Sequence, residues 1–200
     1  MTRARWGGTV HLVNDASNPS SASPKVTARG VSKRFDTTAG EVIALERFDL
    51  EVAQGEVVCI VGPSGCGKST FLRILAGLDT ASGGELTVRR DNPDKPENAV
   101  VFQEYAIFPW KTVRENVAFG LRMRGVPRAE RDATAAHWIE RVGLARFAGA
   151  YPAQLSGGMK QRVAIARALA YDADLLLMDE PLGALDAQTR LTLQEELLRL

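Results

Sequence analysis

The sequence contains few of the residues that build metal clusters and disulfide frameworks. Cys59 and Cys66 are its only cysteines, and His11 and His137 are its only histidines. Both cysteines lie in one apolar, glycine-rich segment. Zinc clusters and disulfide scaffolds need more of these residues at characteristic spacings. Both classes of site are therefore excluded.

Long apolar runs and a charge excess are also missing. The longest strongly apolar runs, such as Val57–Val61 and Leu175–Met178, are far shorter than the roughly 20 residues of a membrane-spanning helix. The formal net charge of +1 gives no overall attraction to nucleic acid or anionic lipid. The N-terminus lacks the apolar core of a secretory signal. We therefore expect a cytoplasmic protein that neither crosses the bilayer nor binds nucleic acid.

What is present is an average globular composition, with 45% hydrophobic and 24% charged residues. At 200 residues, one medium domain is expected. Residues 14–24 form a polar, low-complexity stretch with almost nothing to bury. The sequence therefore predicts a flexible tail over residues 1–24 and a folded domain over residues 25–200.

Apolar patterns predict the elements of an α/β domain. Alternating residues at 26–31 and 42–50 indicate strands of a small sheet. The continuous runs at Val57–Val61 and Leu175–Met178 indicate buried strands, and the first suits a parallel sheet covered on both faces. Residues 70–78 predict a helix between two of these strands.

The middle of the chain has a helical pattern. Thr112 with Glu115 matches a capping box, and a second helix is expected after Pro127, ending near Gly143. Residues 158–171 predict an amphipathic helix. A stripe of leucines continues to the last residue without a capping signal, so we expect the sequence to be cut in mid-helix.

One glycine-rich segment has the spacing G-x-x-x-x-G-K-[ST] between a predicted strand and a predicted helix. Glycines let consecutive backbone N–H groups surround phosphate oxygens. Lys68 supplies a positive charge for the β and γ phosphates, and Ser69 a hydroxyl ligand for Mg²⁺. The predicted ATP site comprises Gly62, Pro63, Ser64, Gly65, Cys66, Gly67, Lys68, Ser69 and Thr70.

Two carboxylates follow the predicted strand at Leu175–Met178. Ligand sites in α/β sheets lie at the carboxyl ends of strands. Asp179 is placed to hold the magnesium shell, and Glu180 to polarise an attacking water as general base. A solvated turn is the alternative, but the phosphate loop argues against it.

A second anion site is predicted where Ser156, Gly157 and Gly158 begin the amphipathic helix. An ordinary serine N-cap explains the serine but not the glycine pair. Two such sites far apart in one chain do not grip one nucleotide. We therefore expect each site to close the nucleotide of another subunit.

Together these segments resemble the ATP-binding subunit of an ATP-binding cassette (ABC) transporter, over residues 25–200. The resemblance implies a P-loop NTPase α/β core with a small N-terminal antiparallel β subdomain and a helical insertion at about residues 104–155. It identifies residues 62–70 as Walker A, Asp179 as the end of Walker B, Glu180 as the catalytic carboxylate and residues 155–159 as the signature.

The resemblance also identifies residues 184–186 as the D-loop, after which the family has a switch histidine. No histidine follows His137, so the C-terminal part is expected to be missing and no switch residue is assigned. For His137 itself, a packing or surface role is expected.

Two further residues are assigned by resemblance alone. Gln103 matches the glutamine that senses magnesium and links the helical insertion to the core. It joins Glu180 and Lys68 among the catalytic candidates, and Ser69 and Asp179 among the metal candidates. Phe35 matches the aromatic that stacks on adenine, with a buried strand aromatic as the alternative.

Residues 105–110 are unusually aromatic for a loop, which favours a partner surface. In the family this region receives the coupling helix of the membrane subunit. The Phe108-Pro109-Trp110 form is similar to importer subunits of the nitrate, sulfonate and taurine group. The alternative is that Trp110 caps the small core of the insertion.

The sequence thus predicts an ATPase that uses ATP and Mg²⁺ to energise a bacterial ABC importer for nitrate, taurine or alkanesulfonates. The expected partners are a second copy in a head-to-tail dimer, integral membrane permease subunits and, indirectly, a solute-binding protein. The expected location is the cytoplasmic face of the inner membrane. Two alternatives stay open: a soluble ABC-type ATPase without a membrane partner, and a non-hydrolysing, nucleotide-gated interaction module.

Overall fold

The structure is a computed structural model that describes residues 9–13, 23–38, 40–183, 190–191 and 194. The chain separates into two compact units, Met1–Asp91 and Asn92–Leu200. The leucine stripe at 193–200 and the D-loop match at 184–186 fall almost wholly outside the described residues.

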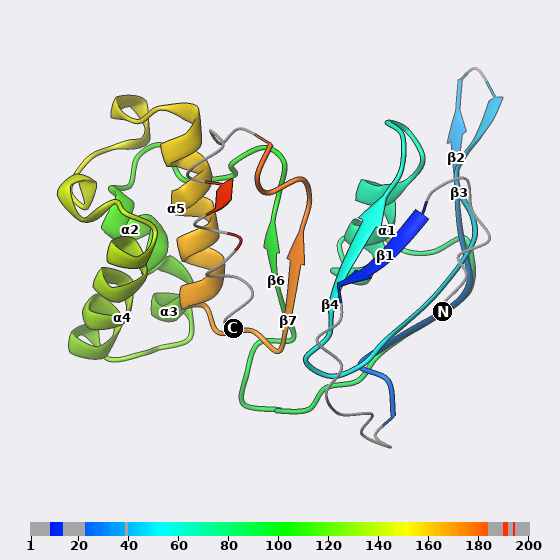
Figure 1. The fold of residues 1–200 in the computed structure, drawn as a ribbon, viewed down its shortest axis with the longest axis horizontal. Helices are drawn as coiled ribbons and strands as arrows, with labels where there is room; N and C mark the ends of the chain where they lie inside the picture. The colour runs from blue at the N-terminus through cyan, green and yellow to red at the C-terminus, as the bar shows by residue number, and fades with distance from the viewer. Residues whose placement is uncertain (1–8, 14–22, 39, 184–189, 192–193, 195–200) are drawn as a thin grey trace. The chain divides into compact units, whose positions relative to one another are not determined.

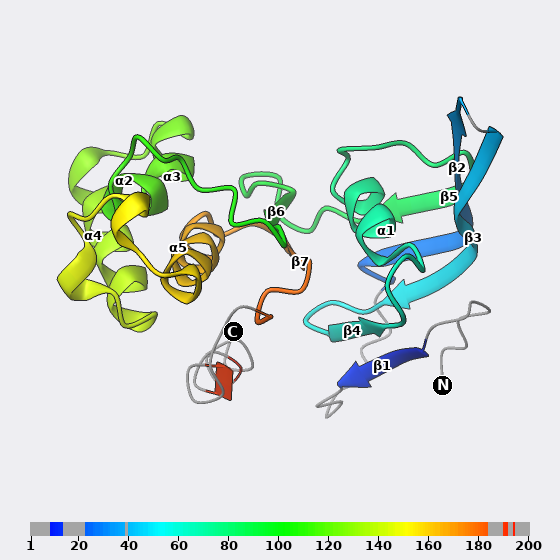
Figure 2. The same cartoon turned by 90° about the horizontal axis from the view of Figure 1, so that it is seen from above.

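The first unit is built on an antiparallel sheet of three strands with β2 in the centre (Figure 2). β2 pairs with β3 along one edge and with β5 along the other. The elements of this unit are β1 (Thr9–Val13), β2 (Val26–Thr37), β3 (Gly40–Val52), β4 (Val57–Val61), α1 (Lys68–Leu75) and β5 (Gly83–Val88).

Alternating burial explains this sheet. Val26, Ala28 and Val31 of β2 are buried, and Phe48 of β3 packs on Phe71 of α1 with ring centroids 4.4 Å apart. One face therefore carries the apolar core while the other carries polar residues, as antiparallel sheets allow. The predicted N-terminal antiparallel sheet is confirmed.

Two findings differ from expectation at β1 and β4. Residues 9–13, within the expected tail, form a strand because Thr, Val and Leu favour extended backbone. β4 pairs antiparallel with β1, and Val57 and Val61 are 45% and 51% exposed. The prediction of a parallel strand buried on both faces is therefore wrong for β4. An apolar run is buried only where neighbouring elements cover it, and in the described part of the chain β4 has a strand neighbour along one edge.

The second unit combines a two-stranded parallel sheet with a helical bundle (Figure 1). β7 pairs with β6 from Asn98↔Leu175 to Val101↔Met178. Leu177 is buried and the rest of β7 is partly buried. The elements are β6 (Asn98–Val101), α2 (Val113–Val117), α3 (Phe119–Met123), α4 (Arg128–Arg141), the 3-10 turns η1 (Ala145–Phe147) and η2 (Pro152–Gln154), α5 (Gly157–Ala170) and β7 (Leu175–Met178).

Helix signals read from the sequence are confirmed in this unit. Thr112 Oγ1 accepts from the Glu115 backbone N–H while Glu115 accepts from the Thr112 backbone N–H, which completes the capping box. The Glu115 carboxylate accepts hydrogen bonds from both the backbone N–H and the hydroxyl of Thr112, and these hold the pKa of the Glu115 carboxyl below its usual value. α4 begins after Pro127, and α5 spans almost the predicted range.

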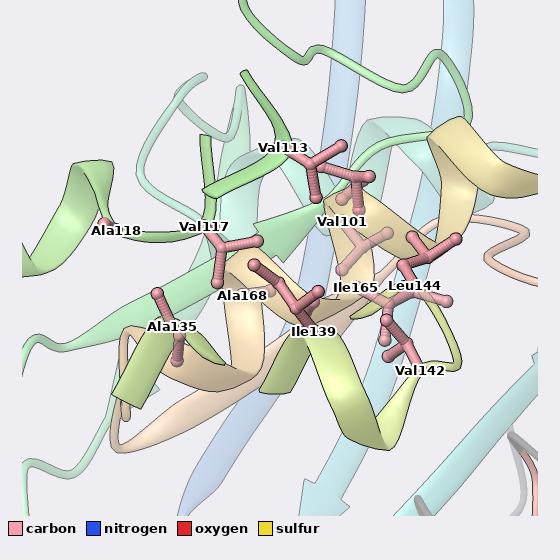
Figure 3. Close-up of a cluster of buried hydrophobic side chains, with 14 of the residues drawn as sticks. Val101, Val113, Val117, Ala118, Ala135, Ile139, Val142, Leu144, Ile165 and Ala168 are labelled. Atoms are coloured by element: carbon pink, nitrogen blue, oxygen red, sulfur yellow. The ribbon is translucent and has the colours of Figure 1, made fainter. Parts of the chain in front are cut away.

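One apolar cluster holds the bundle together (Figure 3). Val113 and Val117 of α2, Ile139 of α4 and Ile165 of α5 meet in it, and each is at most 1% exposed. His137 lies on the exposed side of α4, beside the Trp138 ring, in agreement with its predicted surface role. None of the helices in the described part of the chain is long and apolar enough to span a membrane.

We expect Ile139→Ala to lower the free energy of unfolding of the second unit by about 2–5 kcal/mol, because it leaves a cavity in this cluster. His137→Ala, on the exposed side of the same helix, should change it by less than about 0.5 kcal/mol. Urea denaturation followed by circular dichroism measures both. Equal effects of the two changes would contradict the packing described.

Candidate functional site

The loop between β4 and α1 is kept tight by glycine. Gly65 and Gly67 have φ values of +81° and +96°, where L side chains are strained. A Cβ at Gly67 would lie 2.4 Å from the Ala44 carbonyl oxygen. Only glycine fits this point, so the loop can pass close to β3 and turn directly into α1.

The Lys68 ammonium lies within this loop. Its Nζ donates to the carbonyl oxygens of Gly62 at 2.8 Å and Pro63 at 3.0 Å, and lies 3.7 Å from Cys66 Sγ. α1 begins at Lys68 without a side-chain cap, so its first N–H groups and the positive end of its dipole are offered at the loop. Ser69 follows as the second helical residue. A charge, backbone donors and a hydroxyl are the groups that bind a triphosphate with Mg²⁺.

An aromatic ring lies near the exposed end of β2. Phe35 is 40% exposed and stands opposite Val42 of β3, so the alternative of a buried strand aromatic is wrong. Lys33 Nζ lies 4.9 Å from the Phe35 ring centroid. Such a ring can stack on a flat aromatic group.

The lysine beside this ring is anchored from β2 to the segment after α1. Lys33 Nζ donates to Asp79 Oδ1 at 2.6 Å and to the Thr80 carbonyl oxygen at 2.8 Å. The Lys33 hydrogen bond, followed by that of the Thr80 backbone N–H, holds the pKa of Asp79 below its usual value. The Lys33 charge is therefore fixed beside Phe35.

In the second unit, Gln103 and Glu180 come together although 77 residues separate them in sequence. Gln103 Nε2 donates to Glu180 Oε2 at 3.2 Å. The Asp179 backbone N–H donates to the Val101 carbonyl oxygen at 2.8 Å, which extends the β6–β7 pairing to the carboxylates. Both carboxylates thus sit where the parallel strands end, as predicted.

The backbone at Glu180 is strained. Its φ of +47° lies in the left-handed region, which costs a non-glycine residue roughly 1–2 kcal/mol. Such strain persists only where the surrounding structure enforces it, and it clusters at active sites. Within this unit, the side chains of Asp179 and Gln103 carry oxygen atoms, the ligand type that Mg²⁺ prefers.

The N-terminus of α5 carries the predicted serine and glycine pair. Ser156 caps the helix by accepting from the Met159 backbone N–H at 3.3 Å. A Cβ at Gly157 would lie 2.8 Å from Tyr105 Oη, so the hydroxyl end of Tyr105 would have to shift if a larger residue replaced this glycine. The first glycine of the pair thus leaves room for Tyr105 beside the start of α5.

The aromatic segment 105–110 is hydrogen-bonded to a buried side chain, and its last residue is exposed. Trp110 is 70% exposed, so the alternative in which it caps the core of the insertion is wrong. Asn116 is fully buried. Its Oδ1 accepts from the Phe108 backbone N–H. Its Nδ2 lies within hydrogen-bond distance of three carbonyl oxygens, which share its two hydrogens. Those oxygens belong to Phe108, Lys111 and Thr112.

Sequence reasoning missed the roles of Asn116 and of Arg167 on α5. Arg167 Nη1 donates to the Ala106 carbonyl oxygen at 2.8 Å, and the guanidinium lies 5.7 Å from the Phe108 ring centroid. Both residues act on backbone carbonyls, which no residue pattern records. The one available signal was Arg167 itself, which is the single charged residue within 163–170, a stretch otherwise rich in alanine, valine and isoleucine.

Comparison with known proteins now identifies the family. A family model for ABC transporters matches residues 45–183. The chain is 51% identical to the nitrate import ATP-binding protein of Synechocystis over 84% of this chain and 64% of that protein. It is 48% identical to the bicarbonate transport ATP-binding protein of Synechococcus elongatus over 88% of this chain and 27% of that protein.

A solved structure has the same fold. The ATP-binding cassette MJ0796, determined as a dimer in a post-hydrolysis state with ADP and Pi, aligns with a TM-score of 0.77 at 34% identity. The alignment covers 86% of this chain and 81% of that chain. The present chain spans about two thirds of the length of several curated relatives.

These matches confirm the predicted fold class, a P-loop NTPase cassette of the ABC type. The family model spans more than half of the chain, and sequence and structure agree. The chain therefore belongs to the ABC transporter family, as an ATP-binding protein.

Proposed function

We propose that the full-length protein hydrolyses ATP to drive a bacterial importer. The observation that carries this proposal is the loop 62–67, in which Lys68 Nζ is held among backbone carbonyls at the start of α1. A phosphate entering this loop meets an ammonium and backbone N–H donors that are already positioned.

The residues of the two units have complementary roles in this proposal. Residues 62–70 bind the phosphates, and Phe35 stacks on the adenine. Ser69, Asp179 and Gln103 hold Mg²⁺, which when bound offsets phosphate charge. Glu180 accepts a proton from the attacking water, and its hydrogen bond from Gln103 orients the carboxylate for this step.

The signature segment supports a dimeric cycle. Ser156, Gly157 and Gly158 would contact the nucleotide bound by a second copy, so ATP binding favours the closed dimer and hydrolysis removes that preference. The dimeric MJ0796 cassette bound to ADP and Pi supports this arrangement.

The names of two relatives support transport of a small solute that carries a negative group. Nitrate, taurine and alkanesulfonates are the proposed solutes; one relative is named for nitrate import and the other for bicarbonate transport. The exposed Trp110 segment is proposed to meet the coupling helix of a membrane permease, at the cytoplasmic face of the inner membrane. The permease and a solute-binding protein would then select the solute.

Lys68→Ala should weaken binding of ATP with Mg²⁺ by roughly 10- to 100-fold, because charge-assisted hydrogen bonds to phosphate are lost. Isothermal titration calorimetry on the full-length protein measures the effect. Arg73→Ala removes an exposed charge from the same helix and should leave the affinity unchanged. Unchanged affinity in Lys68→Ala would refute the phosphate role.

Glu180→Gln should retain ATP binding and lower kcat by about 10²- to 10⁴-fold, since the amide cannot accept the proton of water. The variant should also accumulate as an ATP-bound dimer, seen by size-exclusion chromatography with light scattering. Glu97→Gln removes an exposed carboxylate from the same unit and serves as the control. Wild-type turnover in Glu180→Gln would exclude this residue as the base.

The importer proposal is tested by expressing the full-length gene with an affinity tag and identifying what co-purifies from gently solubilised membranes. We expect a permease with several membrane-spanning helices, and stimulation of ATPase activity by its solute. If the protein purifies alone or with ribosomes or DNA, the transport role fails while the ATPase assignment stands.

A further inference from the structure

The segment between Gln103 and Trp110 lies close to α5 at two points along the helix. At the N-terminus of α5, Tyr105 Oη lies directly against Gly157. Nearer the C-terminus, Arg167 Nη1 donates to the Ala106 carbonyl oxygen at 2.8 Å. The segment therefore lies against the helix that begins with the serine and glycine pair.

Arg167 makes the hydrogen-bonded contact of the two. Its guanidinium also lies 5.7 Å from the Phe108 ring centroid, and Phe108 in turn contacts Phe119 of α3 and the exposed Trp110, with centroids 4.5 Å and 5.7 Å away. A charged hydrogen bond and a cation–π contact thus connect one helix residue to an aromatic row that ends at the surface.

The contact between Arg167 and the segment involves an unusual backbone conformation and a buried charge. Ala106 has a φ of +46°, in the left-handed region, and this conformation accompanies the hydrogen bond from its carbonyl to Arg167. Burial lowers the pKa of the Arg167 guanidinium from its usual high value, and an arginine stays charged in that environment.

We propose that Arg167 is a positioning residue that couples α5 to the Trp110 surface, so that movement of the nucleotide-sensing helix changes the shape of the partner-docking segment. This proposal rests on the proposed function, because it assigns ATP-dependent movement to α5 and docking to Trp110. The hydrogen bonds of Asn116 to Phe108, Lys111 and Thr112 hold residues 108–112 together, so a shift at Ala106 is passed on to Trp110.

The variants separate coupling from folding. Arg167→Gln removes the charge and the cation–π contact, while Arg167→Lys keeps the charge and one donor. Phe108→Leu breaks the aromatic row without altering α5. Arg122→Gln removes an exposed arginine from α3 of the same unit and is the matched control. Thermal unfolding shows which variants fold.

The first measurement compares ATPase kinetics of the full-length subunit alone and in complex with its membrane partner. We expect Arg167→Gln to keep the wild-type KM and kcat when alone, and to lose roughly fivefold or more of the increase in kcat on complex formation. Arg167→Lys should regain part of it, and Arg122→Gln should match wild type. A wild-type increase in Arg167→Gln, or equal loss of activity in both states, would overturn the proposal.

The second measurement needs no membrane partner. This measurement uses a full-length Glu180→Gln chain whose only tryptophan is Trp110. ATP with Mg²⁺ should change the tryptophan emission of this chain. Adding Arg167→Gln or Phe108→Leu should abolish the change at saturating ATP. An equal change in these variants, or none with Arg167 and Phe108 intact, would overturn the coupling. If wild-type protein captures no membrane protein but this response is present, the proposed transport role fails and the coupling stands.

Discussion

The packing of α5 is the constraint on which the second unit depends. Its central turn is covered on all sides and consists of small and β-branched side chains: Val163, Ala164, Ile165 and Ala166 are all at most 1% exposed. Small residues let α2, α4 and β6 approach the helix closely, and well-packed interiors transmit displacement because they have few voids. With its axis fixed in this way, α5 presents Ser156 at one end and Arg167 near the other.

Four non-glycine residues in the described part of the chain have positive φ values. Two of them, Glu180 and Ala106, have φ values of +47° and +46° and belong to the candidate site and the aromatic segment. Each is held by a side-chain hydrogen bond from a residue far away in sequence, Gln103 for the Glu180 carboxylate and Arg167 for the Ala106 carbonyl. Costs of this kind persist where other interactions outweigh them, and here both lie on the path between the carboxylates and Trp110.

Local signals in the sequence predicted local structure well. The capping box at Thr112 and Glu115 involves four consecutive residues. The phosphate-loop motif likewise specifies where glycine is needed for a positive φ within one short segment. Both depend on neighbours in the chain, so a single sequence contains the information. The antiparallel pairing of β2 with β3 was similarly accessible, because the two strands form one hairpin.

Non-local properties could not be predicted in the same way. Hydrophobicity alone suggested that β4 is covered on both faces, whereas coverage depends on which other strands and helices reach it. The exposure of Phe35 and Trp110 likewise depends on what surrounds them, and the sequence left both alternatives open. The contacts of Asn116 and Arg167 end on backbone carbonyls, which every residue has, so no pattern of side chains could identify them.

The same distinction bears on how the cassette would work. Motif residues such as Lys68 and Glu180 act directly on nucleotide in the proposed cycle, and their identities follow from the chemistry of phosphate and water. A residue that transmits a change needs instead two stable contacts on separate elements, and geometry alone reveals it. Arg167 meets this condition because its backbone belongs to α5 while its guanidinium contacts Ala106 and Phe108 in the loop. Nucleotide chemistry is therefore readable from the sequence, whereas its connection to a partner surface is readable only from the fold.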